Sequence, residues 1–240
     1  MVALVAGAAV VASAAVGGCG SDSGKKLTHP PYTVKSIQLG FVTVRDIGKG
    51  AIQVQDSDHG SHVIYTPPNS VPTCPYVQRA DNITVAVQPD VEPVGGNSTG
   101  RFIVGPPNAE QSSLPVVTQG AVVFTTDALA DTGMKAVLAE SAKCPASFTI
   151  LGGPPIIVGD YKIHSRAFKS GGWTGFAQQL AHTAPPDLGT TTYDDLTTIV
   201  AHKANAVIYF GYAEIHKIGQ RADSRAKAEK LAKTTLGRLG

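Results

Sequence analysis

The chain has 240 residues, which fits one domain or at most two and is long enough to bury a sizeable core. Its 42% hydrophobic and 16% charged residues are values of a globular protein, and its net charge is only +2. A charge this small creates no general attraction for nucleic acid, so we expect no nucleic-acid partner.

The basic residues gather near the C-terminus. From His216 to Gly240 there are seven Lys or Arg residues and two acidic ones. This pattern indicates the solvated face of a terminal helix, and the alternative is a contact with anionic lipid headgroups.

An uncharged run opens the chain. Val2–Gly18 contains only small and aliphatic residues with a single Ser, and it is shorter than the ~20 residues that a membrane-spanning helix needs. Its length and composition are typical of a signal-peptide core. No Lys or Arg precedes the run, so either translation starts upstream of Met1 or the basic first part of the signal is missing.

A cysteine ends this run. The four residues "VGGC", Val16 to Cys19, resemble the bacterial lipobox, in which an aliphatic residue and two small ones precede the cysteine. The resemblance implies that residues 1–18 are a lipoprotein signal peptide and that Cys19 is acylated after cleavage. Two or more acyl chains would then hold the protein on the extracytoplasmic face of the cell membrane. The alternative is a plain secretory signal with an incidental cysteine.

Residues 19–33 are expected to be the lipidated cysteine and a tether. Gly20–Thr33 is rich in Gly, Ser, Lys and Pro, and a flexible chain of this length reaches roughly 20 Å. No repeat or linker follows, so residues 34–240 are expected to form a single domain.

Two further cysteines lie in this domain. Cys74 and Cys144 would sit in an oxidising compartment, and neither belongs to a CxxC pair or to a Cys/His metal pattern. We therefore expect a Cys74–Cys144 disulfide, which would stabilise the fold by about 4 kcal/mol because it closes a long loop.

The first half of the domain gives weak signals. They indicate a helix at Val34–Ile47 broken by Gly40, a short strand at Ala51–Gln55, a loop at Ser57–Pro75, an alternating strand at Asn82–Val91 and turns at Pro93–Asn108.

The second half gives stronger signals, and they predict two helices and several strands. A strand at Val116–Phe124 precedes a helix whose apolar face is Ala130, Met134, Val137, Leu138 and Ser141, with Thr126 or Asp127 as its N-cap. Strands follow at Tyr161–Phe168 and Trp173–His182, then a hairpin at Asp194–Tyr212 that turns at Lys203–Asn205. An amphipathic helix from about Ile218 to Leu239 closes the chain with Ala228, Leu231, Ala232, Thr235 and Leu239 inward.

Alternation in the expected strand at Tyr161–Phe168 separates two kinds of side chain. Tyr161, Ile163 and Ala167 share one side of the strand; Lys162, His164 and Arg166 share the other. The summed pattern predicts an α+β fold: an antiparallel β-sheet packed against two long α-helices on one face, as a single disulfide-stapled domain.

The order of these elements resembles a known family. A strand and a helix that ends in Cys144, a run of strands and the "KAN" turn at Lys203–Asn205 are similar to the extracellular sensor-type domains of actinobacteria. The outer domain of the mycobacterial serine/threonine kinase PknH is of this type, and related domains occur in envelope lipoproteins. The resemblance implies a sheet-and-helix fold with a cleft for an unidentified ligand and no catalytic residues.

One polar stretch has the residue types of a metal site. "QDSDHGSH" contains Asp56, Asp58, His59 and His62, whose carboxylates and imidazoles suit zinc or manganese. A solvated turn explains this Gly/Ser-rich stretch better, because metal ligands usually come from rigid elements. The sequence also lacks the common nucleophile, zincin and phosphate-loop motifs, so we expect no enzyme and no cofactor.

Two aromatic residues could line a ligand cleft. Trp173 and Phe176 follow the "KSGG" stretch, although a lone Trp at a strand start more often fills the core.

Three hypotheses of function remain. The first is a lipid-anchored envelope lipoprotein whose non-catalytic, sensor-like domain binds a small molecule, glycan, lipid or protein. The second is a lipid or glycolipid carrier with an enclosed apolar cavity. The third and weakest is a metal-dependent hydrolase that uses Asp58, His59 and His62.

Overall fold

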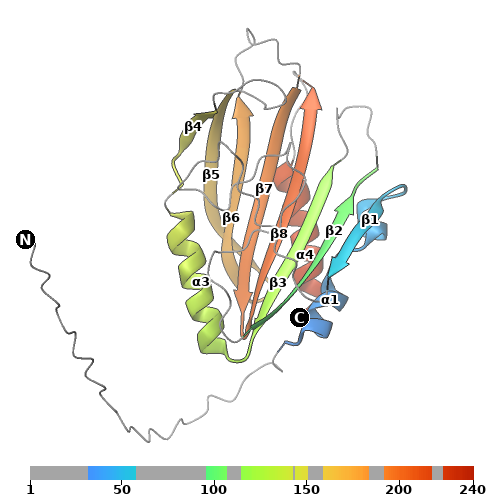
Figure 1. Ribbon diagram of the computed structural model, residues 1–240, viewed down its shortest axis with the longest axis vertical. Coiled ribbons are helices and arrows are strands. Elements are labelled where there is room, and N and C mark those ends of the chain that lie inside the picture. Colours follow the sequence, from blue (N-terminus) through green and yellow to red (C-terminus); the bar gives the residue numbers. More distant parts are fainter. Residues whose placement is uncertain are drawn as a thin grey trace, which may run out of the picture. The chain divides into compact units, whose positions relative to one another are not determined.

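Eight antiparallel strands form one sheet in the order β1-β2-β3-β8-β7-β6-β5-β4 (Figure 1). The computed structural model describes residues 32–57, 96–106, 115–142, 144–150, 159–183, 192–217 and 224–240. The strands are β1 (Ile52–Ser57), β2 (Gly96–Val104), β3 (Val116–Phe124), β4 (Ser147–Ile150), β5 (Gly159–Ser170), β6 (Trp173–Thr183), β7 (Thr192–Lys203) and β8 (Ala206–Lys217). The helices are α1 (Val34–Gly40), α2 (Val44–Ile47), α3 (Asp127–Ser141) and α4 (Ser224–Arg238).

Two tight hairpins join the longest strands. Gly171 and Gly172 connect β5 to β6 with φ values of 56° and 81°, a conformation that favours glycine. The turn between β7 and β8 lies at Lys203–Asn205, as predicted from the sequence. The residue with a left-handed backbone in this turn is Ala204, with φ of 49°.

Both faces of the sheet are apolar and both are covered. On one face, α1 and α4 pack on a cluster that includes Ile199, Phe210 and Trp173. On the other face, α3 packs on Val200 and Tyr209. Neighbouring residues of one strand therefore serve two separate cores, as the alternation of a strand requires. Trp173 is fully buried, which confirms that it fills the core.

The predicted fold class was wrong in two respects. The sheet dominates the fold, and α3 and α4 have only 15 residues each, about 22 Å, whereas a strand of 12 residues spans about 40 Å. These helices lie on opposite faces of the sheet, because each apolar face needs its own cover (Figure 1). Cys74, the expected disulfide partner of Cys144, lies outside the described residues, so the predicted disulfide stays a prediction.

A strand lies where the sequence suggested turns. β2 occupies part of Pro93–Asn108 despite its two glycines, and it pairs with β3 over its whole length, from Gly96–Phe124 to Val104–Val116. Pairing with a strongly β-forming neighbour overrides the local preference of these residues. The expected strand at Asn82–Val91 lies outside the described residues.

The helices largely follow the predicted pattern. The weak helical segment is broken after Gly40 into α1 and α2, and Ala130, Met134 and Val137 of α3 are buried. Thr126 caps α3 by accepting a hydrogen bond from the amide of Leu129 at 3.3 Å. Leu138, expected to face inward, is 44% exposed.

Candidate functional site

Several predicted site residues lie outside the described part of the chain. These residues are Cys19, Cys74, Asp58, His59 and His62. The lipidation site, the metal hypothesis and the pairing of Cys74 with Cys144 therefore stay predictions. The residues that the structure describes contain no group of three or more potential metal ligands. Within the same residues, no helix is long and apolar enough to cross a membrane.

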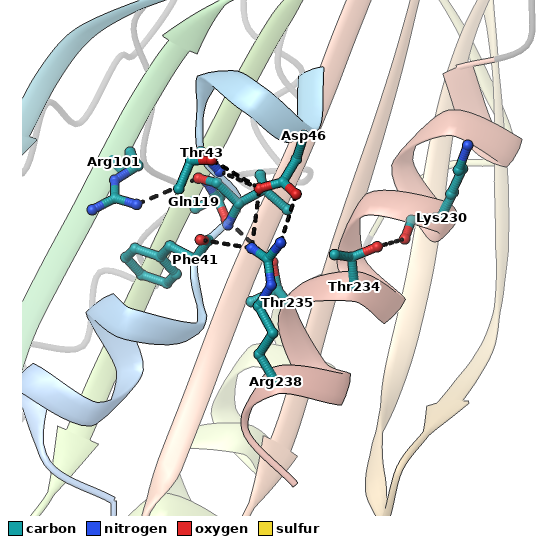
Figure 2. A network of polar contacts seen from close by, with 10 residues as sticks. Phe41, Thr43, Asp46, Arg101, Gln119, Lys230, Thr234, Thr235 and Arg238 are labelled. Carbon is teal, nitrogen blue, oxygen red and sulfur yellow. Dashed lines mark hydrogen bonds and ion pairs between the residues drawn. The ribbon is translucent and has the colours of Figure 1, made fainter. Parts of the chain in front are cut away.

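A polar network fastens α1 and α2 to the sheet and to α4 (Figure 2). The Gln119 side chain of β3 accepts a hydrogen bond from the amide of Val42 at 2.7 Å and donates one to its carbonyl at 3.0 Å. Thr235 of α4 donates to the same Gln119 oxygen at 3.2 Å. Because these groups are buried, the network fixes the segment between α1 and α2 against the sheet.

An ion pair closes the outer side of this network. Arg238 of α4 donates to both carboxylate oxygens of Asp46, at 3.0 and 2.5 Å, and to the Phe41 carbonyl at 3.2 Å. The hydrogen bond from Arg238 is the main reason that the pKa of Asp46 falls from its ordinary 3.8 to about 2. These contacts join α1 and α2 to β3 and α4, so we interpret the network as a structural joint.

A second polar region lies where α4 begins. Six side chains from β6, β7, β8 and the first turn of α4 meet on one face of the sheet. We call them the polar platform: Gln179, Asp195, Thr197, Glu214, Ser224 and Lys227.

Two carboxylates lie side by side in the platform. Asp195 and Glu214 are direct neighbours across β7 and β8, and each is only 2% exposed. Lys227 of α4 donates to a Glu214 oxygen at 2.7 Å, and the hydroxyl of Tyr212 does so at 3.4 Å. One lysine therefore balances one of the two buried acids.

In the part of the chain that the structure describes, the hydrogen-bond donors to the other acid, Asp195, are neutral. Gln179 donates to both of its oxygens, at 3.0 and 3.1 Å, and the hydroxyl of Ser224 also bonds to it. Burial raises the pKa of Asp195, the nearby charge of Glu214 adds to the rise, and these hydrogen bonds offset part of it. Asp195 therefore takes up a proton more readily than an exposed aspartate.

The platform offers groups that can bind a polar ligand. Its groups offer hydrogen-bond acceptors, one cation and a carboxyl that can hold a proton, all fixed on strands. The Ser224 hydroxyl forms hydrogen bonds with Thr197, at 3.1 Å, and with Asp195.

The sequence analysis missed the platform, although a signal for it exists. Asp195 is in phase with the buried residues Ile199 and Ala201, and Glu214 is in phase with Phe210 and Tyr212. A carboxylate at the inward position of an apolar strand is unusual and indicates either a paired charge or a site. Of the predicted cleft residues, Trp173 and Phe176 lie buried in the two cores.

Comparisons with known proteins give a structural similarity. No protein-family model matches the chain, and no curated protein matches it significantly. The chain is similar to the extracellular domain of PknH from Mycobacterium tuberculosis, with a TM-score of 0.56 and 12% sequence identity. This similarity covers 88% of this chain and 98% of that domain.

A second solved structure is much less similar. LpqN, described as involved in cell envelope biogenesis of Mycobacterium tuberculosis, gives a TM-score of 0.28 at 14% identity, over 86% of this chain and 95% of LpqN. That score is too low to support an argument. The first similarity, at 12% identity, shows a shared fold and bears out the fold part of the resemblance found in the sequence.

Proposed function

We propose that the protein is a lipid-anchored envelope protein whose domain binds a ligand or a protein partner without catalysing a reaction. The observation that carries this proposal is the fold shared with the extracellular domain of PknH over nearly the whole length of both chains. The lipobox-like "VGGC" at Val16–Cys19 supports the location, because acylation of Cys19 would place the domain on the extracytoplasmic face of the membrane.

The polar platform is the proposed binding site. Sites built on rigid strands hold their groups more accurately than sites on loops, and the platform draws on three adjacent strands and a helix terminus. Its buried acids favour a polar ligand that donates hydrogen bonds, such as a sugar, an amine or a peptide backbone.

The first experiment tests the anchor. The protein is produced in an actinobacterial host, and the mass of its N-terminal peptide is measured after detergent extraction. We expect a diacylglyceryl group on Cys19, and the Cys19→Ala variant should leave the membrane fraction. An unmodified peptide that still begins at Met1 contradicts the anchor.

The second experiment tests what the domain binds. Native mass spectrometry of protein purified from its own membrane should show a polar ligand whose occupancy falls in the Asp195→Ala variant. A co-purified lipid instead supports the carrier hypothesis. Stoichiometric zinc or manganese in the same sample supports the hydrolase hypothesis that uses Asp58, His59 and His62.

A further inference from the structure

Five cationic side chains and one histidine lie along β5 and α4 on one face of the sheet. We call them the cationic strip: Lys162, His164, Arg166, Arg225, Lys230 and Lys233. All six are exposed. The three on β5 alternate with residues of the opposite face, such as Tyr161 and Ile163, so they point to the same side of the sheet as α4.

One carboxylate joins the strand to the helix. Glu229 of α4 forms ion pairs with Arg166 of β5 and, at 4.0 Å, with Lys233 one turn further along α4. The Glu229 side chain is 16% exposed, whereas Arg166 and Lys233 are 47% and 56% exposed. The Glu229 carboxylate is therefore mostly buried between β5 and α4, whereas Arg166 and Lys233 face the solvent.

Most of the positive charge of the strip is not neutralised locally. Lys162, Arg225 and Lys230 form no ion pair with any residue that the structure describes. The strip carries five permanent cations, against Glu229 inside it and Asp160 at the outer end of β5. From Lys162 to Arg166, and from Arg225 to Lys233, the positive charge extends for about 12–13 Å.

The opposite face of the sheet has a different charge. There α3 presents Asp127 and Asp131 with one cation, Lys135. With Lys169 of β5, the described charges named on that face nearly balance, whereas those of the strip are net positive. A flat anionic surface would therefore attract the strip side more strongly.

The tether is expected to enter at one end of this strip. Tyr32 is the first described residue, and its hydroxyl donates a hydrogen bond to the carbonyl of Leu239, just after α4, at 3.3 Å. Lys203 donates to the carbonyl of Gly171, just after β5, at 2.9 Å, and to that of Gly240. The C-terminal ends of β5 and α4 and the start of the described chain therefore lie at the same end of the sheet.

We propose that the cationic strip rests on the anionic headgroups of the membrane to which the protein is tethered. The inference rests on the proposed function in one respect, because the anchor at Cys19 brings the strip to the membrane. A flexible tether from Cys19 to the residue before Tyr32 reaches roughly 20 Å, and α4 is about 22 Å long, so the whole strip can meet the surface near the anchor.

Binding at the strip is electrostatic. The large exposed hydrophobic side chains of the described residues are Leu39, Ile52, Val54 and Leu138, and none belongs to the strip. No side chain of the strip is suited to insert into the acyl region, so the attraction must weaken with salt.

The test uses the unacylated chain from Gly20 onward, which contains the whole compact unit Pro31–Gly240. Its sedimentation with vesicles of phosphatidylcholine, with and without phosphatidylglycerol, gives a partition coefficient. We expect binding only with phosphatidylglycerol, and its loss in about 1 M salt, where the screening length falls to about 3 Å. Replacing Lys162 and Lys230 with Gln should lower the coefficient about 25-fold, since each surface cation contributes roughly fivefold.

A control with the same change of charge separates the strip from net charge. Lys135→Gln with Lys169→Gln removes two exposed cations from the other face and should leave the coefficient within about twofold of the parent. Equal losses in the two double variants overturn the proposal, as does the absence of binding by the parent chain. Displacement by free glycerol phosphate at a concentration that leaves the ionic strength unchanged also overturns it, because the strip would then be a site for a small anion. Acylation of Cys19 is measured separately, so a failure here leaves the anchor standing.

Discussion

The side chain of Asn205 pairs with both main-chain groups of Tyr32, which lies 173 residues earlier in the chain. It accepts a hydrogen bond from the Tyr32 amide at 2.7 Å and donates one to the Tyr32 carbonyl at 2.9 Å. It also donates to the carbonyl of Phe124 at 2.9 Å. The tip of the β7–β8 hairpin thereby holds the start of the domain and the end of β3.

Replacing Asn205 with Ala should destabilise the domain strongly. The change leaves the buried amide of Tyr32 and two carbonyls without partners, at a cost of about 3 kcal/mol in the free energy of unfolding. Urea denaturation measures the loss. The neighbouring Ala204→Gly variant is the control: Ala204 has φ of 49°, so glycine should relieve about 1 kcal/mol of strain. A loss of stability in both variants would contradict this account of the turn.

Two glycines should respond oppositely to alanine. A Cβ at Gly175 would lie 1.9 Å from the carbonyl oxygen of Val200, which is main chain and cannot move aside. Gly175→Ala should therefore force β6 away from β7 and lower the free energy of unfolding by about 3 kcal/mol. At Gly237 of α4 a Cβ meets nothing, and alanine there should raise stability by about 1 kcal/mol because it is the better helix former. Thermal unfolding of the two variants distinguishes them.

The Asp46–Arg238 pair predicts a loss of stability in acid. The pKa of Asp46 is lowered in the folded state, so its contribution is fully present above about pH 4 and disappears as the pH falls through about 2. Arg238 is 37% exposed, so solvent limits the contribution to about 1 kcal/mol. The Asp46→Asn variant should show a smaller drop in melting temperature than the parent between pH 4 and 2. An unchanged drop would mean that other carboxylates cause it.

The Asp195 carboxyl predicts the opposite pH dependence. Its pKa is raised in the folded state, chiefly by burial, so the protonated form is favoured and stability declines as the pH rises above the ordinary range of an aspartate. Asp195→Asn keeps the shape and removes the buried charge. We expect a higher melting temperature at pH 7 and a flatter pH profile.

Glu214→Gln is the matched control for this prediction. It also removes one buried charge, but it breaks the 2.7 Å ion pair with Lys227 and should give no such gain. A gain of the same size in both variants would mean that the two acids destabilise the fold equally, and that Lys227 does not compensate Glu214.

Elements with a strong local pattern could be predicted from the sequence. The β7–β8 hairpin and the buried face of α3 follow from alternation and helical spacing, since their apolar residues all face a core. β2 could not be found in this way, because a stretch that contains Gly96 and Gly100 becomes a strand only when β3 pairs with it. The side of the sheet that each helix covers could not be read from the strands either, because both faces of β7 are apolar: Ile199 lies in one core and Val200 in the other.

The candidate site was harder to predict for a related reason. Asp195 and Glu214 are 19 positions apart in the sequence, and only the register of β7 and β8 makes them neighbours. Ser224 and Lys227 join them because α4 begins at that point, six residues later than the sequence suggested. A site assembled from the ends of several elements leaves no contiguous motif.

The clamp of Tyr32 by Asn205 also determines how the domain would carry mechanical force. A pull on the tether would act first on Tyr32 and then on the β7–β8 hairpin, which lies in the middle of the sheet. Because β7 and β8 are each paired along both sides, the force meets many hydrogen bonds together. The edge strand β1, whose few bonds would yield one at a time, stays outside this path.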